Sequence, residues 1–366
     1  LDGIQQPGID PGSRQISTSR TCPRAKAGVH SSQMSGLASQ LPVAIVGTGS
    51  YLPDKVLTNS DLEIMVETSD EWITTRTGIK ERRIAAEDEF TSHMAVKASR
   101  QALEQAEIDA SEIQLIIVAT ITPNTLTPAT ACYVQQDLGA HKAVAFDISA
   151  ACSGFLYALK LAKRLISDGA FENALILGAE KLSAFVNWED RSTCVLFGDG
   201  AGAALLKRAE KGEGEILATD IGTDGSQTHL LNIPGGGSAC PITIENADRR
   251  LATLAMIGQD VFKHAVTRMR DSANSVIERS GLQPDDIKLL IPHQANLRII
   301  EAITKRIDIP EERVFVNLHK YGNTSAAACA IALDEAHRAG RFGPGDHIVL
   351  VAFGAGLTWA SAAVRW

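Results

Sequence analysis

Short apolar runs, each followed by a helix-like segment, recur along this chain and constrain its fold more than any other feature. One set of runs begins at residues 115, 144 and 174, and a second begins at residues 289, 314 and 348. Continuous apolar runs of this length are typical of strands covered on both faces. The middle run of each set leads into a loop and a helix of small residues, at 150–156 and 322–328. We therefore predict an α/β fold built by internal duplication of one unit.

Composition divides the chain into three predicted parts. Residues 1–40 are rich in Ser, Gly, Arg and Gln and lack the apolar core of a secretory signal, so we predict a disordered N-terminal extension. We interpret it as a cloning or mis-start extension with Met34 as a candidate start, and an organellar transit segment is the alternative. The polar, glycine-rich junction at 211–214 then separates a first half, residues 41–211, from a second half, residues 212–366.

The charge and the cysteines exclude several classes of function. A formal net charge of −8 argues against general affinity for nucleic acids. The six cysteines are scattered, with no C-x-x-C pair and no H-x-x-x-H pair, so we predict neither a disulfide framework nor a metal site, and we infer a reducing compartment. The longest apolar stretch, 347–364, contains Gly354 and Gly356 and follows a turn sequence, so it predicts buried strands and not a membrane span.

Cys152 is the first candidate for chemistry. It follows the apolar run Ala143–Ile148 and precedes an amphipathic helical segment, which places it at a strand-to-helix turn. The partial positive charge of a helix N-terminus stabilises a thiolate, and small neighbours leave room for a substrate. The alternative is a small buried core thiol.

His293 and Asn323 occupy comparable positions in the second half. His293 follows the apolar run Leu289–Ile291, and Asn296 is suited to cap the helix that comes next. Asn323 follows the run Val314–Val316 and opens a small-residue helix. Taken singly, they would be a loop histidine and a plain N-cap. Because all three residues follow strand ends in a duplicated sheet, we predict that they converge on one site.

Several segments carry a resemblance to a known family. From about residue 42 to the end, the chain resembles the β-ketoacyl-acyl-carrier-protein synthases III, the initiating condensing enzymes of type II fatty acid synthesis. The resemblance implies a thiolase-like, duplicated α/β/α/β/α layered fold with two mixed sheets. The matching segments are 47–53, 68–73, 76–79, 145–154, 197–203, 292–296, 322–327 and 352–356.

The resemblance also implies a mechanism. Cys152 would take an acyl group from acyl-CoA, and malonyl-acyl-carrier protein would follow as the second substrate. His293 and Asn323 would stabilise the enolate as carbon dioxide leaves, and the backbone N–H groups of Cys152 and Ala355 would form the oxyanion hole. Acyl-CoA is a substrate here, and no cofactor is implied. Asn323, in place of a second histidine, indicates the initiating type and not the elongating type.

Residues around this site are implied by the same resemblance. The CoA-binding set is Thr68, Trp72, Arg76, Arg191, Gly258, Phe262 and Asn296, with Trp72 and Arg191 stacking on the adenine. Lys263, Arg268, Arg298, Lys305 and Arg306 would bind the acidic carrier protein. The alternatives are a core role for Trp72 and a solvated helix face for the basic residues. The family also implies a homodimer and a cytoplasmic location, with a plastid as the alternative if residues 1–40 are a transit segment.

One departure from the family bears on the primer. Some short-chain members have a bulky aromatic residue before the proline of the loop that matches 125–128, where it reaches the partner subunit's acyl pocket. This chain has Thr127 at that position. We therefore expect primers longer than acetyl, or branched primers, to fit.

Four other functions remain to be weighed. A nucleotide-binding module is disfavoured because the glycine-rich segments 47–49 and 197–202 lack the complete phosphate-binding patterns. A cysteine hydrolase would act without malonyl dependence. A related condensing enzyme of secondary metabolism, such as a quinolone-type synthase, shares the expected fold. A hydroxymethylglutaryl-CoA-type synthase needs an acid near the cysteine, and in the Cys152 loop only Asp147, upstream, is available.

Overall fold

The structure, a computed structural model, describes residues 41–210, 214–247 and 251–366. The predicted disordered extension, residues 1–40, and residues 211–213 of the predicted junction at 211–214 lie outside the described residues. The division into two halves stays a prediction. The described residues form a single compact unit.

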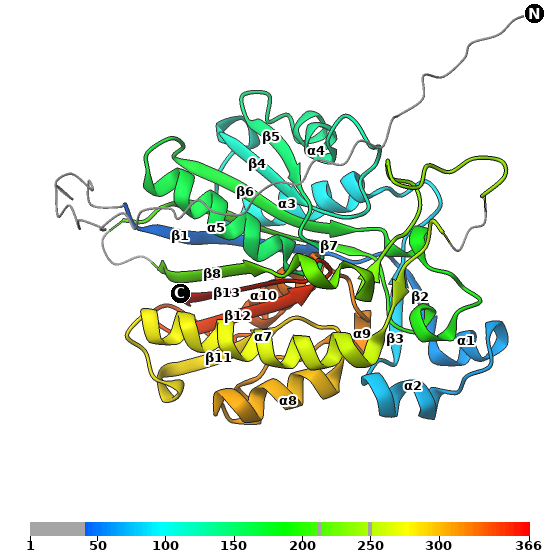
Figure 1. Ribbon diagram of the computed structural model, residues 1–366. Helices are drawn as coiled ribbons and strands as arrows, with labels where there is room; N and C mark the ends of the chain where they lie inside the picture. The colour runs from blue at the N-terminus through cyan, green and yellow to red at the C-terminus, as the bar shows by residue number, and fades with distance from the viewer. Residues whose placement is uncertain (1–40, 211–213, 248–250) are drawn as a thin grey trace, which may run out of the picture. The chain divides into compact units, whose positions relative to one another are not determined.

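Two mixed sheets form the framework (Figure 1). The strands of the first sheet, in spatial order, are β1 (Val43–Tyr51), β7 (Gly200–Arg208), β6 (Asn173–Glu180), β4 (Leu115–Ala119) and β5 (Val144–Ile148). Those of the second sheet are β11 (Ile287–Pro292), β12 (His347–Gly354), β13 (Thr358–Arg365) and β8 (Glu215–Thr223). Strands β4, β5 and β6 run parallel, as do β11 and β12, and the other pairs are antiparallel.

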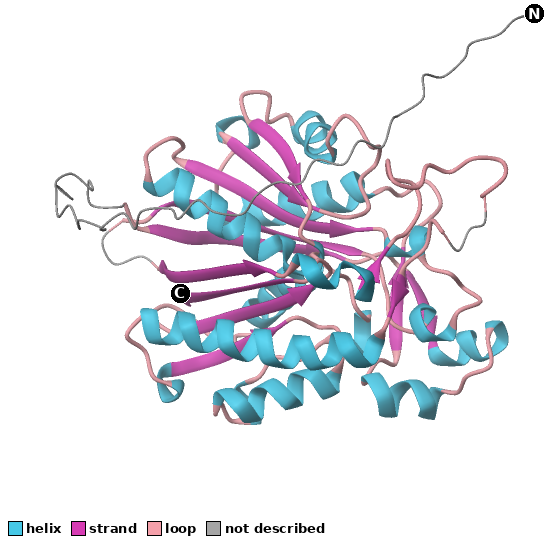
Figure 2. Ribbon diagram, viewed as in Figure 1, coloured by secondary structure: helices cyan, strands magenta, loops and turns pink. Residues whose placement is uncertain are grey.

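Helices complete five layers, as Figures 1 and 2 show. Helices α3 (Thr91–Ala106) and α4 (Thr130–Leu138) cover the outer face of the first sheet. Helices α5 (Gly154–Ser167) and α10 (Ala327–Arg338) lie between the sheets, where they share one apolar cluster with strands of both. Helices α7 (Gly258–Arg279) and α8 (Leu297–Ile307) cover the outer face of the second sheet. The predicted layered fold with two mixed sheets is confirmed.

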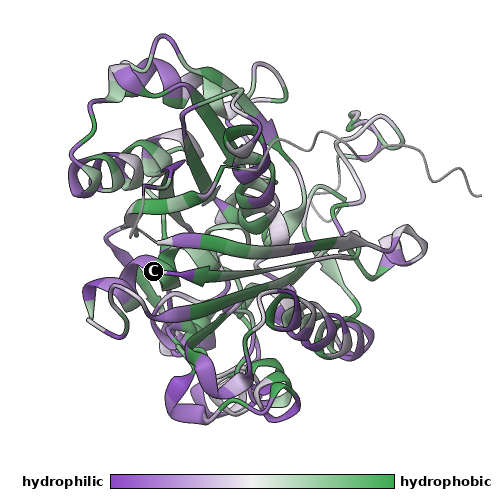
Figure 3. Cartoon of the chain, turned by 90° about the vertical axis from the view of Figure 1, so that its left-hand side faces the viewer, coloured by the Kyte–Doolittle hydropathy of each residue, from purple (hydrophilic) through white to green (hydrophobic). Residues whose placement is uncertain are grey.

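The strands hold most of the apolar side chains. In Figure 3 they are largely green, while the hydrophilic colour gathers on the surrounding helices and loops. All five residues of β4 are fully buried, because helices cover both faces of its sheet. Among the described residues, no helix is long and apolar enough to cross a membrane. The five described cysteines are all free thiols.

Short elements surround the end of the sheets where polar residues gather. They are α1 (Asn59–Met65), α2 (Asp70–Thr77), α6 (Arg191–Cys194), α9 (Leu318–Tyr321) and the small strand pairs β2 (Lys55–Thr58) with β3 (Glu81–Ile84) and β9 (Leu231–Asn232) with β10 (Ala255–Met256). Ser69 caps α2 by accepting a hydrogen bond from the N–H of Trp72 at 3.1 Å. These elements pack in an apolar cluster of their own.

Two strand predictions were wrong. The apolar run Val43–Val46 followed by Gly47–Gly49 predicts a strand that ends in a tight turn, but these glycines lie in the middle of β1. There α3 lies so close that a Cβ on either glycine would meet a carbonyl oxygen of α3 at 2.2 Å. The strand expected at Val314–Val316 is reduced to an isolated bridge between Leu290 and Val314. The side chain of Gln294 replaces the missing ladder, since it donates to the carbonyl of Phe315 and accepts from the N–H of Asn317.

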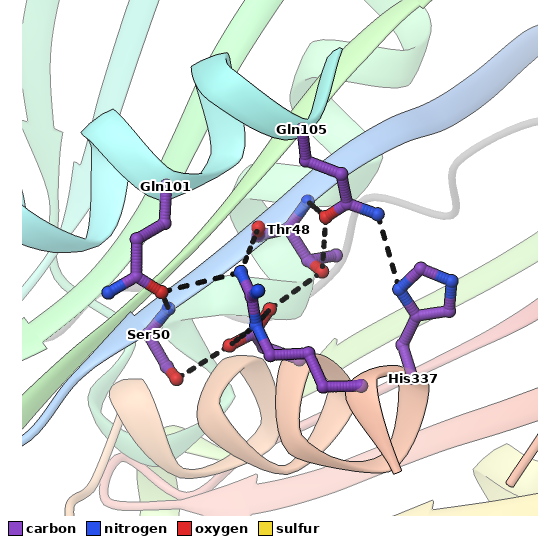
Figure 4. A network of polar contacts seen from close by, with 7 residues as sticks. Thr48, Ser50, Gln101, Gln105 and His337 are labelled. Carbon is purple, nitrogen blue, oxygen red and sulfur yellow. Dashed lines mark hydrogen bonds and ion pairs between the residues drawn. The ribbon is translucent and has the colours of Figure 1, made fainter. Parts of the chain in front are cut away.

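A buried polar network ties β1 to α10 and α3 (Figure 4). The Asp334 carboxylate accepts hydrogen bonds from Thr48 at 2.9 Å and Ser50 at 2.6 Å, and Arg338 pairs with it at 2.9 Å. Gln105, from α3, accepts from the N–H of Thr48 at 2.9 Å. Each hydroxyl at this junction of three elements therefore has a partner, which makes its burial tolerable.

Candidate active site

A cavity of about 790 Å³ brings the three candidate residues together, because Cys152, His293 and Asn323 all line it. It extends from these buried residues to exposed ones, including Arg76 and Arg298. A second cavity of about 220 Å³ also reaches Cys152 and is lined mainly by apolar residues, including Leu182 and Leu231. Both lie at the carboxyl ends of parallel strands, where sites of α/β proteins gather.

Cys152 lies in a one-turn 3₁₀ helix, Ala151–Ser153, between β5 and α5. The preceding Ala151 has a left-handed φ of 46°, so the turn is sharp and strained. The Gly354 backbone packs against this turn, because a Cβ on Gly354 would lie 2.6 Å from the Cys152 nitrogen. The predicted strand-to-helix turn is confirmed, and Cys152 borders two cavities, unlike a core thiol.

The ionisation expected for Cys152 was wrong for the resting site. Burial raises the pKa of the Cys152 thiol to about 12, so it is protonated at neutral pH. The residue is only 8% exposed, and loss of hydration outweighs the helix N-terminus. Its Sγ lies 3.5 Å from Ser325 Oγ, a hydrogen bond in which the thiol is the donor. A thiolate must therefore be made by transfer of a proton to a neighbouring group.

His293 follows the last residue of β11. Its backbone N–H donates to the carbonyl of Val351 at 2.8 Å, which fixes the loop against β12. Among the described residues, neither of its ring nitrogens has a hydrogen-bond partner. Burial lowers the pKa of His293 to about 4, so the ring is neutral at pH 7, with one N–H donor and one acceptor.

Backbone hydrogen bonds to the segment that precedes β7 position Asn323. Its N–H donates to the carbonyl of Leu196 at 2.8 Å, and its carbonyl accepts from the N–H of Gly198 at 3.1 Å. Its side-chain Oδ1 accepts from the N–H of Ser325 at 2.8 Å. This leaves the Nδ2 group as a donor for a ligand. The plain N-cap alternative does not hold, because α10 starts later, with Ala326 as its cap.

Glu180, at the end of β6, is the functional candidate that the sequence did not reveal. Its carboxylate accepts from Ser325 Oγ at 3.0 Å, from Thr122 Oγ1 at 2.7 Å, and from Thr120 and the N–H of Ile121 at 3.1 Å. Burial raises the pKa of Glu180 to about 7 in spite of these donors. An acid therefore lies two hydrogen bonds away from Cys152.

Asp147, the acid considered from the sequence, has a different task. Its carboxylate accepts from the backbone N–H groups of Thr130 at 2.6 Å and Ala131 at 2.8 Å. It therefore caps the start of α4.

The exposed end of the larger cavity carries an aromatic residue between two cations. The guanidinium carbons of Arg76 and Arg191 lie 4.4 and 4.9 Å from the centre of the Trp72 ring. Arg191 also donates to the carbonyl of Glu67 at 2.8 Å. Such a cluster offers flat stacking surfaces and positive charge, which suit a phosphorylated aromatic ligand.

Comparisons with known proteins agree on one family. The model of 3-oxoacyl-[acyl-carrier-protein] synthase III matches residues 146–225, and the model of its C-terminal part matches residues 277–366. A β-ketoacyl-[acyl-carrier-protein] synthase III from Caldanaerobacter subterraneus is 55% identical over 330 residues, which are 90% of this chain and 99% of that protein. The chain belongs to the β-ketoacyl-acyl-carrier-protein synthase III family.

Solved structures agree with this membership. The crystal structure of 3-oxoacyl-[acyl-carrier-protein] synthase III from Aquifex aeolicus is 50% identical, with a TM-score of 0.82 over 88% of this chain and 100% of that one. OleA from Xanthomonas campestris, at 20% identity and a TM-score of 0.78, shares the fold alone. As a synthase III, the protein is an acyl-transferring condensing enzyme that initiates fatty acid biosynthesis.

The structure brings together many of the residues predicted for a synthase III. The larger cavity is lined by the catalytic set Cys152, His293 and Asn323 and by Trp72, Arg76, Gly258, Phe262, Lys263, Asn296 and Arg298. Ala355 lines the smaller cavity beside Cys152. Asn296 caps α8, as predicted, by accepting from the N–H of Arg298 at 2.9 Å, and its Nδ2 donates to the carbonyl of Arg76 at 3.1 Å.

Other predicted residues of the synthase III site do not line either cavity. These are Thr68, Thr127, Arg191, Lys305 and Arg306. Arg191 remains at the mouth through Trp72, and Lys305 and Arg306 are exposed in the last turn of α8. Arg268 packs over Trp359 at 4.5 Å and pairs with Asp224 at 3.6 Å.

Two residues of this site went unpredicted. A signal existed for Glu180, since an acid ends an otherwise apolar strand without any turn sequence. Ser325 lay inside a segment, 322–327, that was used only to find Asn323. Neither signal shows that the two side chains meet, because Glu180 and Ser325 are 145 residues apart in the sequence.

Proposed function

We propose that this synthase III transfers an acyl group from acyl-CoA to Cys152 and condenses it with malonyl-acyl-carrier protein. The observation that carries the proposal is the single cavity that joins Cys152, His293 and Asn323 to the Trp72 cluster at its mouth. A cavity of about 790 Å³ is within the usual size of small-molecule sites. The proposed chemistry uses only side chains, backbone groups and the two thioesters.

In the first half-reaction the Cys152 sulfur attacks the thioester carbonyl and CoA leaves. The backbone N–H groups of Cys152 and Ala355 are assigned to the oxyanion. Thr358 supports this assignment, because its Oγ1 lies 3.0 Å from the Ala150 carbonyl and 3.1 Å from the Ala355 carbonyl. The hydroxyl thus holds the two loops in register, which is the preorganisation that an oxyanion hole needs.

In the second half-reaction malonyl-carrier protein loses carbon dioxide. A neutral His293 ring and the Asn323 Nδ2 group both offer N–H donors in the same cavity, where an enolate oxygen develops charge. The enolate carbon then attacks the acyl group on Cys152, and the β-ketoacyl product leaves with the carrier protein. Neutral donors suit this task, since a cation would also bind the departing carboxylate.

Binding of the two carriers is assigned to the cavity mouth. CoA would use Trp72, Arg76 and Arg191, with Thr68, Gly258, Phe262 and Asn296 along its arm. Carrier protein would use the exposed cations Lys263, Arg298, Lys305 and Arg306. Lys263 is paired with Asp260 at 3.1 Å, so Arg298, on the cavity wall, is the strongest member of that set.

The acyl chain is assigned to the smaller cavity beside Cys152. Its volume of about 220 Å³ and its apolar lining support primers longer than acetyl. A homodimer is supported by two exposed apolar features of the first sheet: Val144, at the start of the edge strand β5, is 52% exposed, and Leu126, in the loop between β4 and α4, is 92% exposed. Thr127, next to Leu126, would then face the partner's acyl pocket.

We also propose a cytoplasmic location, supported by the bacterial origin of the similar synthases. The plastid alternative depends on residues 1–40, which lie outside the described residues.

Intact-mass measurement after incubation with acetyl-, isobutyryl- and octanoyl-CoA tests the proposal. We expect an acyl adduct on the unchanged chain, none on Cys152→Ala, and the same adduct on Cys329→Ala, whose buried thiol borders neither cavity. Adding malonyl-carrier protein should discharge the adduct as a β-ketoacyl product. Discharge by water alone would indicate a hydrolase, and strict preference for acetyl would remove the longer-primer proposal.

A further inference from the structure

The Cys152 thiol needs a proton acceptor, and its hydrogen bond identifies one. The thiol donates to Ser325 Oγ at 3.5 Å, and Ser325 Oγ donates to Glu180 Oε1 at 3.0 Å. The three side chains come from the turn before α5, the segment before α10 and the end of β6. They form one unbroken chain of hydrogen bonds from the reacting sulfur to a carboxylate.

The environment of Glu180 is that of a buried hydrogen-bond acceptor and not that of a surface charge. Its exposure is 0%, and it forms no ion pair within the described residues. Three hydroxyl groups and one backbone N–H converge on it. Buried carboxylates are rare unless paired, so such a fully hydrogen-bonded group at a site is a candidate for proton transfer.

Ser325 is held in an unusual conformation. Its φ is 49°, in the left-handed region that residues with a Cβ rarely adopt. Its N–H donates to Asn323 Oδ1 at 2.8 Å, which locks the backbone. In this backbone conformation the Ser325 hydroxyl lies between Cys152 and Glu180. The hydrogen bond from the Ser325 N–H also orients the Asn323 side chain.

We propose that Ser325 and Glu180 form a proton relay for Cys152, with Ser325 as a catalytic residue and Glu180 as a positioning residue that holds the proton. This inference rests on the proposed function, since it takes Cys152 as the acyl acceptor. Thr120, Thr122 and Ile121 hold the carboxylate in line with Ser325.

The relay balances over the whole reaction. During acylation the S–H bond of Cys152 breaks, its proton moves to Ser325 Oγ, and the Ser325 proton moves to Glu180. The sulfur bonds to the acyl carbon, the bond from that carbon to the CoA sulfur breaks, and the CoA thiolate takes a proton from water. Glu180 keeps its proton until the condensation expels the Cys152 thiolate, which takes it back through Ser325. One proton is thus consumed per turnover, as loss of the malonyl carboxylate as carbon dioxide requires.

The titratable groups near Glu180 either have a pKa far from that of Glu180 or are bound to other partners. The Cys152 thiol lies beyond Ser325, and its pKa of about 12 is far higher. His293 lines the larger cavity with Cys152 and not with Glu180, and burial lowers its pKa to about 4. Lys181 directs its Nζ to the carbonyls of Ala86 and Glu87, and Asp199 accepts from Ser183 and the N–H of Ala85.

Single-turnover acylation measures the relay without the second substrate. Quenched intact-mass time courses with acyl-CoA give the rate of adduct formation on the unchanged chain, Glu180→Gln and Ser325→Ala. We expect both variants to acylate on the order of 100-fold more slowly. Ser99→Ala is the matched control for Ser325→Ala, because Ser99 is also buried but its hydroxyl donates to the Ala95 carbonyl in α3 and lines neither cavity, so this variant should acylate near the original rate.

A pH profile separates proton transfer from a structural role. Only ionised Glu180 accepts a proton, and burial raises its pKa to about 7, so the unchanged chain should lose acylation rate as the pH falls through about 7. Glu180→Gln should lack this decline. Unchanged rates in both variants, or a slow Glu180→Gln that keeps the decline, would overturn the relay. If Glu180→Gln does not fold, Ser325→Ala decides. If the unchanged chain forms no adduct, the proposed function fails and not the relay.

Discussion

Asn323 pairs by its backbone with Phe197, in a parallel bridge between segments that are far apart in the sequence. The bridge fixes Asn323 beside Cys152 and His293, although no regular strand carries it. The Asn323 side chain is fixed as well, because Oδ1 accepts from the N–H of Ser325 at 2.8 Å. Its orientation therefore follows from contacts on both sides, and its Nδ2 group is left for the substrate.

Asn323→Asp tests this donor role with little change of shape. The carboxylate keeps the acceptor for Ser325 but replaces the N–H donor with a negative oxygen beside the developing enolate. We expect the condensation rate to fall at least on the order of 100-fold, while acylation of Cys152 persists. Intact mass and product formation measure the two steps separately. A variant that condenses normally would exclude Asn323 from enolate stabilisation.

Trp72 should contribute to CoA binding and not to chemistry. Two guanidinium carbons lie 4.4 and 4.9 Å from the centre of its ring, and an adenine would stack there in place of one of these groups. Trp72→Ala should raise the KM for acyl-CoA about tenfold, equivalent to about 1.4 kcal/mol of stacking, with kcat little changed. Acyl-pantetheine, which lacks the adenine, is the control substrate. If its KM rises equally, Trp72 acts as a core anchor.

His293 should make stability depend on pH in a defined window. Burial lowers its pKa from 6.5 to about 4, so the unfolded chain binds a proton more readily than the folded one. The folded state is therefore not penalised above pH 6.5 and loses stability as the pH falls from 6.5 toward about 4. The loss reaches about 3 kcal/mol. Denaturant unfolding measures the free energy of unfolding of the unchanged chain and of His293→Ala at each pH. The difference between these two free energies isolates the contribution of His293 from that of other groups, and it should change by about 3 kcal/mol across this pH range. A constant difference would contradict a neutral His293.

Periodicity and local composition predicted much of the framework. The apolar runs at 115, 144, 174, 289 and 348 all became strands. Four of them supply mostly buried side chains, while the run at 144 forms the partly exposed edge strand β5. The run at 314 did not become a strand, because the side chain of Gln294 takes hydrogen bonds that a neighbouring strand would have made. No local pattern encodes that replacement.

The candidate site was predicted in part for a similar reason. Cys152, His293 and Asn323 each follow a strand end or its equivalent, which sequence patterns can locate. The link from Cys152 through Ser325 to Glu180 depends on how three segments pack, and so does the burial that raises the pKa of Cys152 to about 12. Charge near a helix N-terminus is readable from sequence, but the extent of desolvation is not.

The network around Asp334 gives a prediction for stability alone. Asp334→Ala removes the acceptor of the Ser50 hydroxyl and one of the two acceptors of the Thr48 hydroxyl, and it leaves the half-exposed Arg338 without its carboxylate, so we expect a loss of about 1 to 3 kcal/mol in the free energy of unfolding. Asp271→Ala, at an exposed ion pair on α7, is the matched control and should change that energy by less than about 0.5 kcal/mol. Asp334 lines neither cavity, so acylation of Cys152 should continue at the original rate below the unfolding transition. Equal unfolding energies for the two variants would mean that water satisfies the two hydroxyls, and that the network orients β1 on α10 without stabilising the fold.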